Sequence, residues 1–276
     1  MRHFSFLALG LLFVSVTQAQ AGSPPTAHET VFYLSGKLRI EAYLYRPEGP
    51  GPFPIMIYSH GSRPGRERTE MPFAYVGKML ASSGYLVLVP ERRGYGKSEG
   101  ALFSEEVGED RGLRYVTRLQ QEADDVIAAA EFAKTLQGAD ASRIAVMGWS
   151  FGGIVSVFAA SRSALFRVVV DQAGGALSWE GSPMLQTALK EAAGKINVPL
   201  LGMVAENDRT TESVKSVVGE AKKHGAVARL IVYPKFKPSE NPGSVAPGHM
   251  IFSAQGVRLW ESDLKDFLKR EIAAPN

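Results

Sequence analysis

The sequence of 276 residues contains no cysteine. Disulfide bonds, a cysteine nucleophile, thiolate metal sites and a lipid attached to cysteine are therefore excluded, and a large hydrophobic core must provide the stability. The formal net charge is only +3, too small to indicate binding to nucleic acid. The chain also shows no repeat of about 20 to 50 residues, no heptad array and no low-complexity tract.

The N-terminus carries an apolar run, Phe4 to Val16, after a basic start. This run is too short to span a bilayer comfortably. Small residues at Ala19 and Ala21 then give the A-x-A pattern of a cleavage site. We predict that residues 1–21 are a secretory signal peptide of an exported protein, periplasmic or extracellular, without stable membrane insertion. The alternative is a retained anchor, although no stop-transfer pattern follows.

Residues 22–276 are long enough for a single domain with a complete core. An antiparallel hairpin comes first, and apolar runs then alternate with helical patterns. This order predicts an α/β fold, with a doubly wound, mostly parallel sheet of eight strands and helices on both faces. Strands are expected at 29–34, 38–46, 53–59, 85–90, 144–147, 167–171, 198–205 and 228–233, and helices at 71–83, 116–136, 183–193, 210–224 and 254–270.

Two polar segments interrupt this pattern. The stretch from Glu91 to Tyr115 is predicted to be a surface loop, and its part Ala101 to Gly108 shows no convincing helical pattern. The loop after the third strand contains a basic cluster, Arg63, Arg66 and Arg68. This cluster could favour anionic substrates, but a solvated loop is the simpler interpretation.

Two pentapeptides fit the pattern G-x-S-x-G, around Ser150 and around Ser98. In this motif a strand turns sharply into a helix, and the serine is exposed at the turn. Ser150 follows an apolar strand and precedes a run compatible with a helix, whereas Ser98 lies in the polar stretch. We therefore predict that Ser150 is a nucleophile and that Ser98 is a loop serine.

A serine hydroxyl needs a neighbouring base, and a carboxylate must hold that base in the right tautomer. His249 lies in the loop between the last strand and the last helix, where its side chain can reach the carboxyl edge of the sheet. His28 belongs to the N-terminal linker, His60 follows an early strand, and His224 can cap a basic helix. We predict His249 as the base, with an exposed loop histidine as the alternative.

The carboxylate is expected between the serine and the histidine in the sequence. Asp208 comes three residues after the strand 198–205 and therefore lies at the same edge of the sheet. Asp171, at the end of the preceding strand, is the main rival, and Glu206 is interpreted as a capping or salt-bridging residue. The resulting chain order Ser, Asp, His is the one found in α/β hydrolases.

Together these residues resemble the α/β-hydrolase superfamily, and within it the dienelactone-hydrolase-like and prolyl-oligopeptidase-like catalytic domains. The resemblance covers nearly the whole chain after residue 21 and rests on His60–Ser62, Glu91–Ser98, Gly148–Gly153, Asp208 and His249. It implies an oxyanion hole formed by the backbone amides of Phe151 and Ser62, with Gly61 as an alternative second donor, and no metal or organic cofactor. However, dienelactone hydrolases carry cysteine at the position of Ser150, and prolyl oligopeptidases add a propeller domain for which this chain has no room.

The expected activity is that of a secreted serine hydrolase that cleaves a small-molecule ester, or a related activated acyl group, through an acyl-enzyme. The segment 174–195 is long enough for one helix, which predicts a minimal lid and an open cleft. Trp149 either lines the acyl pocket or packs beside the turn. The alternatives are a small peptidase acting on short peptides and a non-catalytic binding protein with the hydrolase fold; the oligomeric state cannot be read from the sequence.

Overall fold

The computed structural model describes Met1 and residues 28–240, 243 and 245–272. The predicted signal peptide therefore lies outside the described residues, except for Met1. Among the residues described, no helix is both long and apolar enough to cross a membrane.

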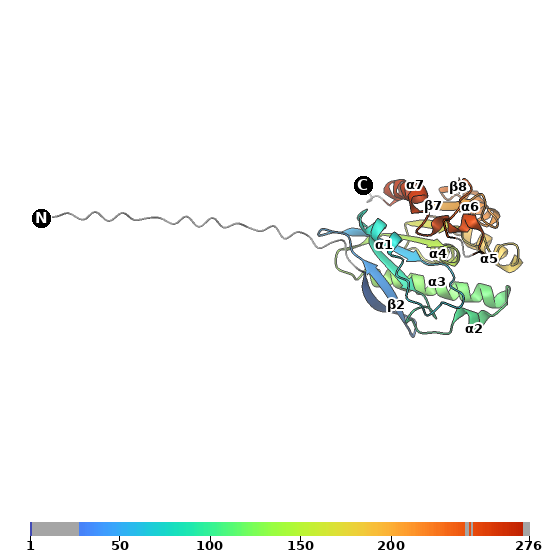
Figure 1. The fold of residues 1–276 in the computed structure, drawn as a ribbon, viewed down its shortest axis with the longest axis horizontal. Helices are drawn as coiled ribbons and strands as arrows, with labels where there is room; N and C mark the ends of the chain where they lie inside the picture. Colours follow the sequence, from blue (N-terminus) through green and yellow to red (C-terminus); the bar gives the residue numbers. More distant parts are fainter. Residues whose placement is uncertain (2–27, 241–242, 244, 273–276) are drawn as a thin grey trace.

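One sheet of eight strands organises the described chain (Figure 1). Its order is β1-β2-β4-β3-β5-β6-β7-β8. The pairs β1–β2 and β2–β4 are antiparallel and the other pairs are parallel, which confirms the predicted mostly parallel sheet. The strands are β1 Glu29–Ser35, β2 Leu38–Tyr45, β3 Phe53–Ser59, β4 Leu86–Glu91, β5 Ala139–Trp149, β6 Val168–Gln172, β7 Leu200–Ala205 and β8 Ala228–Tyr233.

Helices follow most of the parallel strands. They are α1 Ala74–Ala81, α2 Phe103–Val107, α3 Leu113–Ala133, α4 Phe151–Arg162, α5 Pro183–Ala193, α6 Glu212–Lys223 and α7 Val257–Glu271, with a 3-10 helix, η1, at Pro247–Phe252. The longest helix, α3, lies across the molecule in Figure 1 and packs against α4, which in turn contacts α5. The central strands β4, β6 and β7 are buried along their whole length, which explains why their sequences are continuous apolar runs.

The prediction of a surface loop from Glu91 to Tyr115 is wrong for its first part. Glu91, Arg92 and Ser98 are each about 1 % exposed or less. Arg92 is buried because its guanidinium donates to Glu122 of α3 at 2.7 Å, and burial of a charge requires such a partner. The expectation of no helix at 101–108 is also wrong, since α2 forms there and packs the ring of Phe103 against its neighbours.

Candidate active site

The turn between β5 and α4 places Ser150 in a strained conformation. Its backbone has φ 60° and ψ −116°. Residues other than glycine rarely adopt such a positive φ, which costs about 1–3 kcal/mol. Glycines make the turn possible: a Cβ on Gly148 would collide with the backbone of Gly152, and a Cβ on Gly152 would collide with the carbonyl of Ser59. The strand, the turn and the helix thus have the arrangement predicted from the pentapeptide around Ser150.

Asp208 and His249 come from different segments and form a buried pair. Nδ1 of His249 lies 2.8 Å from Oδ2 of Asp208, and Oδ1 of Asp208 accepts a hydrogen bond of 2.7 Å from the amide of Arg209. The residue before the histidine, Gly248, packs so closely that a Cβ there would collide with the amide of Asp208. The loop after β7 and the η1 helix are therefore held together at the point where the carboxylate meets the imidazole.

The other ring nitrogen of His249, Nε2, is buried and has no hydrogen-bond partner among the residues described. The imidazole lies against the indole of Trp149, with 5.6 Å between ring centroids, so it sits beside the turn that carries Ser150. No hydrogen bond joins Ser150 to His249 in this structure. Such contacts are often long before a substrate binds.

The loop after β3 lies against the same turn. A Cβ added to Gly61 would be 3.3 Å from Cβ of Ser150 and 3.9 Å from its Oγ. Phe151 begins α4, where the first amides have no partner within the helix. Within the described chain, neither the Phe151 amide nor the Ser62 amide donates a backbone hydrogen bond. Gly61 thus lies next to the serine, and Ser62, which follows it, is exposed.

The rival residues have other surroundings. Oγ of Ser98 bonds to the amide of Glu41 and to the carbonyl of Glu91. Asp171 accepts a hydrogen bond of 2.7 Å from the amide of Gly174, and burial raises its pKa to about 7. It makes no hydrogen bond to a histidine in the part of the chain that the structure describes.

Two of the histidines that were not predicted as the base have contacts that belong to the fold. His60 is fully buried, and burial together with Arg92 and Arg63 lowers its pKa. Nδ1 of His224 lies 3.0 Å from the carbonyl of Glu220 in the last turn of α6, in agreement with the predicted capping role.

The expectation of a solvated basic loop is wrong for Arg63. Arg63 is 7 % exposed and forms a bidentate pair with the carboxylate of Glu91. Its two neighbours in the cluster, Arg66 and Arg68, are exposed, and Arg68 donates to the carbonyls of Gly96 and Gly100 at 3.3 and 3.0 Å. The expectation failed because local charge density does not show which arginine has a buried partner far away in the sequence.

Sequence reasoning also missed two groups near the turn. Asn207 exchanges two hydrogen bonds of 2.9 Å with the backbone of Phe236, so it ties the loop after β8 to the segment that carries Asp208. The ring of Phe151 contacts Phe103 and Tyr115, with centroid distances of 5.0 and 5.7 Å. Asn207 directly before Asp208 was visible in the sequence, but nothing there pointed to its partner.

Within the described chain, no cluster of three or more potential metal ligands is present.

Solved structures share this arrangement of strands and helices. Acylaminoacyl peptidase of Pyrococcus horikoshii superimposes with a TM-score of 0.67 at 20 % identity, over 90 % of this chain and 42 % of that one. An esterase of Pyrococcus furiosus superimposes with a TM-score of 0.63 at 19 % identity, over 90 % of this chain and 92 % of that one. The chain has the α/β-hydrolase fold.

Sequence comparison finds similarity between part of the chain and known proteins. The model of the prolyl oligopeptidase family matches residues 72–182. The quorum-quenching protein AidA of Acinetobacter baumannii is 30 % identical over 129 residues, which are 47 % of this chain and 38 % of that protein. A probable dipeptidyl-aminopeptidase B of Phaeosphaeria nodorum is 30 % identical over 110 residues, or 11 % of its length. The chain thus spans less than half the length of these relatives.

Proposed function

We propose that this protein is a serine hydrolase that cleaves carboxylic esters, or related activated acyl groups, through an acyl-enzyme. The hydrogen bond of 2.8 Å between Asp208 and His249 carries the proposal. It orients the imidazole and leaves the buried Nε2 without a partner, beside the turn that carries Ser150. A base held in this way can accept the proton of a serine hydroxyl.

In the proposed reaction Oγ of Ser150 attacks the carbonyl carbon, and Nε2 of His249 takes the hydroxyl proton. The carboxylate of Asp208 stabilises the imidazolium that results. The amides of Phe151 and Ser62 donate to the oxyanion, each contributing about 3 kcal/mol to the transition state. The intermediate then collapses, and His249 gives its proton to the leaving alkoxide oxygen, which departs as the alcohol. His249 next takes a proton from water, which attacks the acyl-enzyme; the acid is released and Oγ of Ser150 regains its proton.

The second candidate is a peptidase that acts on short peptides. It is favoured by the match to the prolyl oligopeptidase family and by the similarity to acylaminoacyl peptidase. The similarity to an esterase over nearly that enzyme's whole length supports ester cleavage. Hydrolysis of p-nitrophenyl acetate and of aminoacyl anilides by the same preparation separates the two activities. We expect the ester to be the better substrate; a higher kcat/KM for the anilides would overturn that assignment.

We also propose that the protein is exported, on the basis of the leader pattern in residues 1–21. The mature protein is then expected to begin at Gly22. Cell fractionation followed by N-terminal sequencing tests both points: protein found only in the cytoplasm would contradict export, and an intact N-terminus on exported protein would contradict cleavage after residue 21.

A further inference from the structure

The loop that follows β3 is held by two consecutive residues, Glu91 at the end of β4 and Arg92 directly after it. Arg63 of this loop donates through both terminal nitrogens to the carboxylate of Glu91, with 3.0 Å between Nη1 and Oε1. Arg92 donates through Nη2 to the carbonyl of His60 at 2.9 Å. The loop 60–63 is therefore fixed at both of its ends, with Gly61 and Ser62 between them.

Further contacts brace the same loop. Arg63 also donates to the carbonyl of Thr69 at 3.0 Å, and its guanidinium lies over the ring of Tyr95 at 5.1 Å. The imidazole of His60 lies edge-on to Tyr95, with 4.6 Å between ring centroids, and Nδ1 donates to the carbonyl of Gly61 at 2.6 Å. The loop thus has little freedom to move while the pair of Arg63 with Glu91 is intact.

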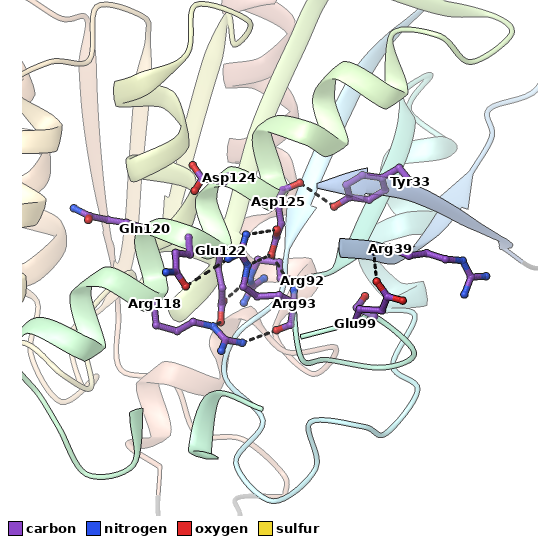
Figure 2. Close-up of polar contacts among 12 residues, drawn as sticks. Tyr33, Arg39, Arg92, Arg93, Glu99, Arg118, Gln120, Glu122, Asp124 and Asp125 are labelled. Atoms are coloured by element: carbon purple, nitrogen blue, oxygen red, sulfur yellow. Dashed lines mark hydrogen bonds and ion pairs between the residues drawn. The ribbon is translucent and has the colours of Figure 1, made fainter. Parts of the chain in front are cut away.

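A buried ionic network connects this support to helix α3. Arg92 donates to Glu122, which also accepts from Arg118 at 3.2 Å (Figure 2). A parallel pair joins Arg93 to Asp125, with bonds of 3.0 Å from Nε and 2.8 Å from Nη2. In Figure 2, Arg92 and Arg93 come from the segment after β4 and reach carboxylates on α3, whereas Arg118 belongs to α3 itself. No described hydrogen bond joins Arg93 to the loop 60–63.

The supported loop is the one that touches the proposed nucleophile. Gly61 is close enough that a Cβ there would lie 3.4 Å from the carbonyl of Trp149 and 3.3 Å from Cβ of Ser150. A displacement of the loop therefore changes the distance between its amides and an oxyanion formed at Ser150. Hydrogen-bond donors stabilise the transition state only where they meet the developing charge.

We infer that Arg63, through its bidentate pair with Glu91, is a positioning residue that holds the second oxyanion donor in place. This inference rests on the proposed hydrolase function. Loosening the pair is expected to weaken transition-state stabilisation while substrate binding is largely retained. A misplacement of about 1 Å can lower a rate about 100-fold.

Replacement of the guanidinium by an amine tests the inference, because lysine keeps the charge but loses the bidentate geometry. In Arg63→Lys we expect the acylation rate on p-nitrophenyl acetate to fall about 10- to 100-fold, with KM changed less than about threefold. The inhibition constant of a trifluoromethyl ketone should rise in parallel, since its tetrahedral adduct places an oxyanion in the same site. A purely structural role would not shift that constant selectively.

Arg93→Lys is the matched control, since it makes the same change in a bidentate pair on the neighbouring segment. It should lower the melting temperature to a similar degree and leave both rate and inhibition constant within about twofold of wild type. Glu91→Gln changes the same pair from its other side and provides a second test, with the same expected changes in rate and inhibition constant, should Arg63→Lys fail to fold. Equal activity of the Arg63 and Arg93 variants, or a rate loss without weaker ketone binding, would overturn the inference. A wild type that is inactive on esters and unlabelled by a fluorophosphonate would instead overturn the proposed function, and the inference with it.

Discussion

Asp208 and Asp171 stand at the carboxyl ends of the neighbouring strands β7 and β6, yet their environments differ. Asp208 bonds to the imidazole of His249 and to the amide of Arg209. Asp171 is buried beneath the turn, and a Cβ on either Gly153 or Gly174 would collide with its carboxylate. Burial favours the protonated form of Asp171, so its pKa rises to about 7, whereas the role proposed for Asp208 requires a carboxylate. The two residues can therefore be distinguished by substitution.

Asp208→Asn is expected to lower kcat by about 10³- to 10⁴-fold. The amide would donate to Nδ1 and favour the tautomer in which Nε2 carries the proton, so that His249 cannot accept one from Ser150. Asp171→Asn replaces a group that is readily neutral by a neutral isostere, and activity is expected to stay within about threefold. Steady-state kinetics on p-nitrophenyl acetate provides the comparison. A larger loss in the Asp171 variant would show that the wrong carboxylate has been assigned.

At the scale of elements, the close approach of α4 to the ends of β3 and β5 depends on small residues. A Cβ on Gly152 would collide with the carbonyls of Ser59 and His60, whereas a Cβ on Gly219 in α6 would meet nothing. We expect Gly152→Ala to lower the free energy of unfolding by about 1–3 kcal/mol. Gly219→Ala should raise it by about 0.5–1 kcal/mol, since alanine favours helix. Urea unfolding measures both changes, and equal effects would contradict this packing at the turn.

The same elements show what the sequence could and could not predict. The sheet was predictable because strands buried on both faces are continuous apolar runs, and α5 begins and ends as expected at Pro183–Ala193. The burial of Glu91 and Arg92 was not, because charged residues are usually exposed and the partner Glu122 lies 30 residues further on. The available signal was the spacing of four residues between Arg118 and Glu122, which places both side chains on one face of α3. The short η1 helix around His249 was missed for a different reason, since 3-10 turns have no strong apolar period.

At the scale of the whole molecule, the sheet brings together segments distant in the sequence at the carboxyl ends of its parallel strands. The turn after β5 carries Ser150, the loop after β7 carries Asp208, and the segment after β8 carries His249. The chain order of the three residues and their places relative to the strands could be predicted from the pattern alone. The contact of His249 with Trp149 and the support of the loop 60–63 depend on packing, and only the structure shows them.

The central claim is that Ser150 is the nucleophile, and covalent labelling tests it most directly. A fluorophosphonate reacts with a serine only where a base activates it and donors stabilise the adduct. Mass spectrometry of the digested wild type is expected to find the adduct on the peptide that contains Ser150, with none in a folded Ser150→Ala variant. A folded wild type that remains unlabelled, or an adduct on Ser98, would contradict the account.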